Sequence, residues 1–268
     1  MIDIADFLWP EGLAGALTTS WDDGAPEDRR LVAILEAHDI KGTFSLNSAR
    51  VARAGKGNDD VREDEVPSLY AGHEVATHGH EHPWYTKISD DEIAEDITTD
   101  RRELERVTGS PVTGHALPFG AYDTRVLAKL RECGIVYSRT VKATKKFALP
   151  DDFIEWHPTC HHKADLGEIW ERFMESAKPG KLFYLWGHSY EFANDSNWHV
   201  IEDFAARAGA EKSVWRTTNM QVFEYVAAWR GLVRSVDGRS FRNPSALDVW
   251  VSVGGKPLRV PAGGSLAA

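Results

Sequence analysis

The feature that most constrains this chain is the alternation of short strand-like runs with helix-like runs along most of its length. We predict strands at residues 16–21, 42–46, 74–77, 112–117, 135–138 and 181–186. We predict helices near residues 26–38, 89–107, 124–131, 166–176, 199–208 and 220–234. This order is typical of parallel strands joined by crossover helices. We therefore expect an α/β fold closed into a (β/α) barrel, with its chemistry at the carboxyl ends of the strands.

The last part of the chain has a different pattern, because the helical periodicity stops. Residues 248–260 are typical of a β-hairpin that turns at Gly254-Gly255. We predict a barrel domain at residues 1–234 and a small β-hairpin appendage, packed on the barrel, at residues 235–268.

Composition and charge restrict the partners of this chain. Its formal charge of −10 disfavours nucleic acid, because phosphate binding needs a basic surface. The chain has no run of 18 apolar residues, so we expect no membrane span. The first residues lack the pattern of a signal peptide, which favours a cytoplasmic protein unless a secreted form was trimmed. An edge strand of the hairpin could pair with a second copy, so a homo-oligomer stays open.

Polar side chains gather where three of the predicted strands end. Asp22 and Asp23 follow the strand at residues 16–21, and adjacent acids on a chain that leaves a strand can face one site. Asp-Asp-Gly is also common in solvated turns, so this pair alone leaves both interpretations open.

The second cluster is the histidine-rich segment at residues 78–83 (HGHEHP). His78 and His82 share a face if the segment forms a helical turn, and two neutral imidazoles at that spacing suit a divalent metal ion. The alternative is an accidental surface cluster. His80 cannot share that face, so we place it behind the site or in solvent.

The third cluster is Trp186-Gly187-His188, after an apolar run. This histidine can be a hydrogen-bonded structural residue or a general acid, because imidazole titrates near neutrality. One carboxylate and two histidines would leave an open position for water on Zn²⁺ or a similar ion, which lowers the pKa of that water. With a second carboxylate as base and a histidine as acid, the three clusters predict hydrolysis of an amide or an ester.

These clusters resemble the motifs of the polysaccharide deacetylases, also called NodB-homology or carbohydrate esterase family 4 proteins. Residues 20–24 (SWDDG) resemble the family's Thr/Ser-Phe-Asp-Asp-Gly motif. Residues 78–83 resemble its His-Ser/Thr-x-x-His-Pro motif, with Gly79 where Ser or Thr is usual. Residues 117–120 resemble the end of its Arg-x-Pro-Tyr/Phe-Gly motif, and residues 186–188 resemble its closing Leu-x-His motif. The order and spacing agree over most of the chain.

The resemblance implies a distorted (β/α) barrel with one divalent ion, most often Zn²⁺, with Co²⁺, Ni²⁺ or Mn²⁺ as alternatives. It implies that the metal ligands are Asp23, His78 and His82. It also implies that Asp22 is the general base and His188 the general acid.

The family likeness also indicates the oxyanion site and the substrate. The backbone N–H near Phe119, between Pro118 and Gly120, would help to hold the oxyanion. The implied partner is an acetylated saccharide, which would lose an acetyl group.

The chain departs from the family pattern at Ala116, where the motif has an arginine that pairs with the catalytic base. Without a cation beside it, Asp22 would be less well oriented, with a raised pKa. Our hypothesis is that Arg139, after the next predicted strand, reaches Asp22 instead. The alternative is that Arg139 forms a surface salt bridge.

A second departure is the segment at residues 156–162 (WHPTCHH), which replaces the usual Asp-x-x-Asp-Trp block and resembles a segment of one divergent subgroup. Here His161 or His162 could line the cleft with Trp186, hydrogen-bond the leaving group or orient His188. Glu191 could brace the acid, or simply pack in its loop.

The sequence leaves three candidate functions. The first is a metal-dependent deacetylase or esterase that removes N- or O-linked acetyl groups from a saccharide or oligosaccharide. The second is an allantoinase-like hydrolase of cyclic ureides or amides that uses the same metal site. The third is a carbohydrate-binding relic without turnover, which the missing arginine suggests and the retention of Asp22 and His188 disfavours.

Overall fold

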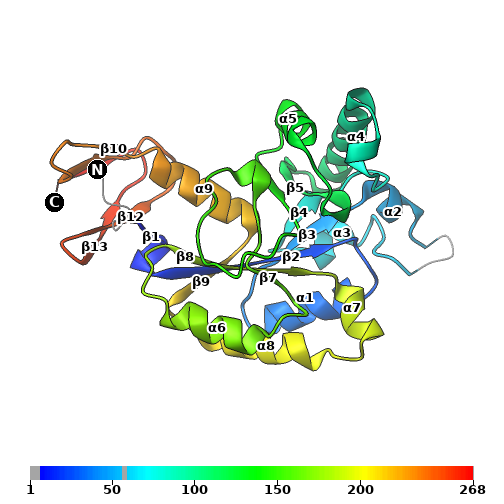
Figure 1. Cartoon of the computed structure of the whole chain (residues 1–268), viewed down its shortest axis with the longest axis horizontal. Helices are drawn as coiled ribbons and strands as arrows, with labels where there is room; N and C mark the ends of the chain where they lie inside the picture. The colour runs from blue at the N-terminus through cyan, green and yellow to red at the C-terminus, as the bar shows by residue number, and fades with distance from the viewer. Residues whose placement is uncertain (1–6, 56–58, 268) are drawn as a thin grey trace.

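The computed structural model describes residues 7–55 and 59–267. Figure 1 shows a central sheet with helices around it and a small β region at one end. The outermost residues of the two predicted domains, 1–6 and 268, lie outside the described part of the chain.

The central sheet is parallel and, within the described ranges, has eight strands. Their order is β6-β5-β4-β3-β2-β8-β7, with β9 paired to β2. The strands are β2 (Gly15–Asp22), β3 (Thr43–Leu46), β4 (Glu74–Thr77), β5 (Gly114–Ala116), β6 (Tyr137–Arg139), β7 (Cys160–His161), β8 (Lys181–Gly187) and β9 (Val214–Thr217). Strand β2 is central: it pairs with β8 along its length, with β9 near its start and with β3 near its end.

The segment that ends in β7 links the two edges of this curled sheet. Trp156 exchanges backbone hydrogen bonds with Ser138 and Thr140, at β6. A few residues later, the Thr159 and His162 N–H groups donate to carbonyls of β8. The α/β, distorted barrel that the sequence predicts is therefore confirmed, with this segment bridging the gap between β6 and β8.

Helices cover the outside of the sheet, and α1, α6 and α8 lie together on one side of it (Figure 1). They are α1 (Asp28–Ala37), α2 (Ser48–Arg53), α3 (Val66–Leu69), α4 (Asp90–Thr108), α5 (Thr124–Glu132), α6 (Leu166–Glu175), α7 (Ser189–Asn194), α8 (His199–Ala210) and α9 (Asn219–Arg230). A capping box starts α4, because Ser89 and Glu92 satisfy each other's backbone N–H groups, and a Ser followed three residues later by Glu is its sequence signature. None of the helices in the described ranges has the length and apolar character needed to cross a bilayer.

The alternation of side chains along β2 carries one acid into the barrel. Leu17 and Trp21 pack in the core outside the barrel, together with residues of α1, α6 and α8. Because neighbouring side chains of a strand point to opposite faces, Thr18, Ser20 and Asp22 face the interior, and all three are buried. Asp22 thus lies at the carboxyl end of the strand with its side chain inside.

Within residues 7–55 and 59–267, the β region contains the predicted hairpin and four further short strands. Strands β12 (Val249–Val253) and β13 (Lys256–Val260) form the hairpin, and β1 (Phe7–Leu8) pairs with β12. The other strands are β10 (Val233–Arg234), β11 (Ser240–Arg242) and β14 (Ser265–Ala267).

This arrangement corrects one helix boundary. The helix expected to reach residue 234 ends at Arg230, because Gly231 follows it and Val233–Arg234 pairs with β11. The division into residues 1–234 and 235–268 stays a proposal, and the small sheets draw strands from both sides of it.

Candidate active site

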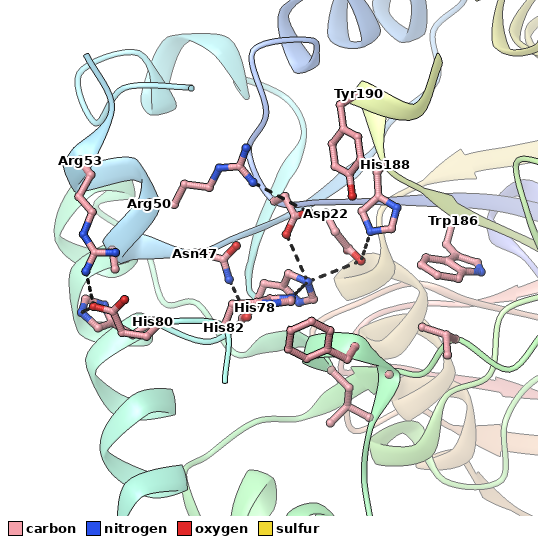
Figure 2. A pocket seen from close by; sticks show the side chains of 17 residues that line it. Asp22, Asn47, Arg50, Arg53, His78, His80, His82, Trp186, His188 and Tyr190 are labelled. Carbon is pink, nitrogen blue, oxygen red and sulfur yellow. Dashed lines mark hydrogen bonds and ion pairs between the residues drawn. The ribbon is translucent and has the colours of Figure 1, made fainter. Parts of the chain in front are cut away.

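A cavity of about 1000 Å³ opens at the carboxyl ends of the strands, where the sequence predicts the chemistry. Figure 2 shows His78, His82, Asp22 and His188 close together in it, with Trp186 to one side. The lining residues are Asp22, Asp23, Asn47, Ala49, Arg50, Arg53, His78, His80, Glu81, His82, Leu117, Phe119, Gly120, Val141, Trp186, His188 and Tyr190.

The three predicted metal ligands converge. One donor atom each from Asp23, His78 and His82 lies within 4.8 Å of the other two. The Nε2 atoms of His78 and His82 are 3.1 Å apart, and His78 Nε2 lies 3.7 Å from Asp23 Oδ1. Two imidazole nitrogens and one carboxylate oxygen form a donor set that suits Zn²⁺ or a similar divalent ion.

The surroundings of the two histidines favour metal binding. His78 Nδ1 lies 2.8 Å from the Ala116 carbonyl oxygen. A carbonyl only accepts, so Nδ1 carries the proton and neutral His78 offers its Nε2 lone pair to the cavity. Burial and the neighbouring His78 lower the pKa of His82 to about 4, which keeps its imidazole neutral.

A hydrogen-bonded loop places His78 and His82. Asn47, at the end of β3, donates through Nδ2 to the carbonyls of His78 and Gly79, at 2.8 Å each. Asp96 of α4 accepts from the backbone N–H groups of His80 and Glu81 at 3.0 Å. These contacts bind the turn between the two histidines from both sides.

Glycine at position 79 has a local physical reason. Its φ is +79°, and a Cβ atom there would lie 2.9 Å from both Asp96 Oδ2 and the Tyr85 hydroxyl oxygen. The Ser or Thr that the family motif has at this position would meet these two atoms. This departure from the family motif therefore fits the loop of this chain.

Three non-glycine residues of the cavity lining have an unusual backbone conformation. Asp23, His82 and Phe119 have φ values of +84°, +55° and +57°. Non-glycine residues rarely adopt positive φ, and such conformations concentrate at functional sites, where the surrounding contacts hold them.

Asp22 forms an ion pair with Arg139 inside the barrel. Arg139 Nη2 donates to Asp22 Oδ2, and both side chains are almost completely buried. Burial acts to raise the pKa of Asp22, but the positive charge of Arg139, with smaller contributions in the same direction from the His78 and His188 imidazoles, outweighs it and lowers the pKa to about 2. Asp22 Oδ1 is buried and has no hydrogen-bond partner among the described residues. The hypothesised contact between Arg139 and the candidate base is thus present.

His188 lies on the other side of Asp22. Its Nε2 is 3.9 Å from Asp22 Oδ2, and its Nδ1 is 3.0 Å from Glu191 Oε2. Burial acts to raise the pKa of Glu191, but hydrogen bonds from Lys163 and His188 outweigh it and lower the pKa. The ionised Glu191 can therefore accept a hydrogen bond from the Nδ1–H group of His188, which directs Nε2 to the cavity.

The segment Pro118-Phe119-Gly120 forms one 3-10 turn at the rim of the cavity. The Phe119 ring stacks on Trp84 at 4.2 Å and lies 4.4 Å from the His82 ring. The predicted oxyanion segment is thus beside a candidate metal ligand.

The structure corrects the expectation for His161 and His162, since the lining of the cavity includes neither. His162 is fully buried and packs 4.2 Å from the Phe192 ring, centroid to centroid. This packing needs Gly187, because a Cβ atom there would lie 2.0 Å from His162 Nδ1. The His161 ring lies 6.2 Å from the His188 ring, and Trp186 is among the residues that line the cavity.

Some residues of the site were missed by the sequence reasoning. Asn47 follows the strand β3 directly, so the rule that chemistry follows strand ends could have found it. Asp100 is buried on the face of α4 that carries Ile97 and Leu104. An acidic residue among apolar residues on one helix face could have indicated a buried polar contact. Asp100 accepts from the backbone N–H groups of Ser48 and His78.

Comparison with known protein families shows that the segment with the candidate metal ligands and Asp22 matches a family model. A family model described as polysaccharide deacetylase matches residues 13–138. This range runs from β2 into β6 and contains Asp22, Asp23, His78 and His82. Comparison with curated proteins gave no match.

Solved structures share the fold at low sequence identity. A Mycobacterium smegmatis protein assigned as a polysaccharide deacetylase has a TM-score of 0.66 and 19% identity, with 87% of this chain and 96% of that chain covered. The PuuE allantoinase has a TM-score of 0.63 and 15% identity, with 80% and 91% covered. A carbohydrate esterase family 4 pseudoenzyme from Bacillus anthracis has a TM-score of 0.52 and 19% identity, with 80% and 66% covered.

Proposed function

Because this chain belongs to the polysaccharide deacetylase family over residues 13–138, we propose that it is a metal-dependent hydrolase of acetylated saccharides. The acetyl group would be N- or O-linked, on a saccharide or an oligosaccharide. The observation that carries this proposal is the position of Asp22 between the candidate metal ligands and His188. Its Oδ2 atom lies 3.8 Å from His78 Nε2 and 3.9 Å from His188 Nε2.

The donor set fits one divalent ion, for which Zn²⁺ is our first choice. Asp23, His78 and His82, which all line the cavity, would hold it and would leave a coordination place for water or substrate. When bound, such an ion acts as a Lewis acid for the acetyl carbonyl and for water.

The residues of the chain would handle the protons. Asp22 is ionised, and its carboxylate can take a proton from the attacking water. Arg139 donates a hydrogen bond to Oδ2 of this carboxylate, which orients the base. His188 would donate its Nε2 proton to the leaving nitrogen or oxygen, while Glu191 accepts a hydrogen bond from Nδ1. A backbone N–H near Phe119 would stabilise the oxyanion.

The second candidate is a hydrolase of cyclic ureides or amides that uses the same residues. The likeness to the PuuE allantoinase, with 91% of that chain covered, favours testing it. A carbohydrate-binding relic is the third candidate, since one structural neighbour is a pseudoenzyme. The presence of Asp22 and His188 beside the metal site speaks against a relic, because metal binding alone does not need them.

One assay separates the three candidates. Acetate release is measured from acetylated chito-oligosaccharides and acetylated xylan, and ring opening is measured with allantoin. Each is run with Zn²⁺, with a chelator and with the Asp22→Asn variant. We expect acetate release that both the chelator and the variant abolish. Allantoin turnover without acetate release would support the second candidate, and no turnover of any substrate would support the relic.

A further inference from the structure

Three donors meet on the carboxylate of Glu191, behind His188. His188 Nδ1 is 3.0 Å from Glu191 Oε2, and His161 Nε2 is 3.1 Å from the same oxygen. Lys163 Nζ lies 3.0 Å from the other oxygen, Oε1. These residues come from two segments, since His161 ends β7 and Glu191 lies in α7.

The backbone fixes the tautomer of His161. The Lys163 N–H donates to His161 Nδ1 at 3.2 Å, so that nitrogen carries a lone pair. The proton of neutral His161 is then on Nε2, which is the atom that faces Glu191. Burial lowers the pKa of His161 to about 4, in keeping with a neutral ring. His161 therefore donates a hydrogen bond to Glu191.

The same geometry argues against a second metal site. One donor atom each from His161, His188 and Glu191 lies within 4.8 Å of the others, which is a spacing that a metal ion could use. Metal binding at His161 Nε2 would move the proton to Nδ1, where it would face the Lys163 N–H. The Lys163 ammonium beside Glu191 would also repel a cation.

We propose that His161 is a positioning residue for His188, and this inference rests on the proposed role of His188 as the general acid. Glu191 has a flexible side chain, and a second donor on Oε2 together with Lys163 on Oε1 holds the carboxylate in one place. The fixed carboxylate then holds the His188 ring with Nε2 toward Asp22. Trp186 packs 4.5 Å from the His161 ring and 5.7 Å from the His188 ring, which limits motion of both.

The test compares two substituted proteins on two substrates. His161→Phe removes the donor, whereas His161→Gln keeps an amide N–H that can reach Glu191. His157→Phe is the matched control, since its side chain has the same 22% exposure as that of His161 and its Nδ1 contacts Thr140 instead. An acetylated saccharide needs protonation of its leaving group, whereas 4-nitrophenyl acetate releases a phenolate that does not.

We expect His161→Phe to lower kcat on the saccharide about tenfold with little change in KM, and to change the aryl ester rate less than twofold. His161→Gln and His157→Phe should keep most of the saccharide rate. Equal losses on both substrates, or no loss on either, would overturn the proposal.

A second measurement stands even if the wild-type protein releases no acetate. Nitrogen-15 spectra of histidine-labelled protein distinguish the two imidazole tautomers. We expect the Nε2–H tautomer for His161, unchanged by one equivalent of Zn²⁺ per chain. An Nδ1–H tautomer, or loss of the Nε2 proton when Zn²⁺ is added, would refute the hydrogen-bonded arrangement. Failure of acetate release alone would refute only the proposed function.

Discussion

Arg139 lies directly opposite Ala116 in the parallel pairing of β6 with β5. Its guanidinium reaches across the barrel to the Asp22 carboxylate and also lies 4.3 Å above the Trp186 ring. The family motif has an arginine at the position of Ala116. In this chain the arginine is Arg139, at the paired position of the neighbouring strand β6. Its guanidinium contacts Asp22, the candidate base.

Removal of this guanidinium tests its role. Arg139→Ala leaves the buried Asp22 carboxylate without its cation, and we expect turnover to fall about 100-fold, because the base loses its orientation. It should also lower the free energy of unfolding, by about 3–5 kcal/mol if Asp22 stays ionised. Acetate release and urea unfolding measure the two effects. Arg131→Ala, which removes a half-exposed arginine, is the control.

The double variant Ala116→Arg with Arg139→Ala moves the cation back to β5. Because the two positions are register partners, we expect it to recover about tenfold of the lost turnover. An unchanged rate in Arg139→Ala would refute the role of Arg139, and a double variant no better than the single one would refute the exchange of positions.

Gly79→Ser restores the residue type of the family motif and should nevertheless weaken this protein. The new Cβ would lie 2.9 Å from Asp96 Oδ2, in a backbone conformation with φ of +79°. We expect a loss of about 1–3 kcal/mol in the free energy of unfolding, together with weaker Zn²⁺ binding, because the loop carries both histidine ligands. Urea unfolding and calorimetric titration measure these changes.

Gly72→Ser controls for backbone strain, since Gly72 has φ of +80° but a Cβ atom there would have no neighbouring atom within 4 Å. If Gly79→Ser lowered the free energy of unfolding no more than Gly72→Ser, close contact with Asp96 would not explain why residue 79 is a glycine.

Asp28 should make stability depend on pH. It is fully buried, and burial raises its pKa from 3.8 to about 7, although hydrogen bonds from Ser189 and Tyr70 act in the opposite direction. The folded state holds this proton more tightly than the unfolded state, so the stability it contributes is complete below about pH 4 and is lost as the pH rises to about 7.

Asp28→Asn lacks this titration. The difference in free energy of unfolding, variant minus wild type, should therefore rise by about 1.4 kcal/mol per pH unit between roughly pH 5 and 6.5, and stay constant above about pH 8. Urea unfolding at several pH values, with chelator present, measures it. The exposed Asp203→Asn is the control, and a difference that does not change with pH would contradict this assignment.

The sequence predicted the parts of this molecule that depend on local pattern. Strand ends determine where Asp22, Asp23 and His78 lie, and the carboxyl ends of parallel strands meet at one edge. The capping box at Ser89 likewise needs only residues three apart. Such features follow from short segments, so they could be predicted without the structure.

Other features depend on contacts between distant segments. The His162 ring fits in its buried position only because Gly187 has no side chain, and the sequence near residue 162 does not indicate this contact. Pairing of Phe7–Leu8 with β12 joins the two ends of the described chain, which no local pattern encodes. The sequence alone leaves two interpretations of Arg139 open, a contact with Asp22 and a surface salt bridge. Only the closed barrel brings Arg139 and Asp22 together.

The most direct test of the proposed metal centre is a titration of metal-free protein with Zn²⁺ while acetate release from an acetylated oligosaccharide is followed. We predict that activity rises in proportion to Zn²⁺ and levels off at about one ion per chain. His82→Ala should neither bind the ion nor release acetate. Full acetate release by metal-free protein, or tight binding of Zn²⁺ by His82→Ala, would contradict the claim that Asp23, His78 and His82 form the metal centre of a hydrolase.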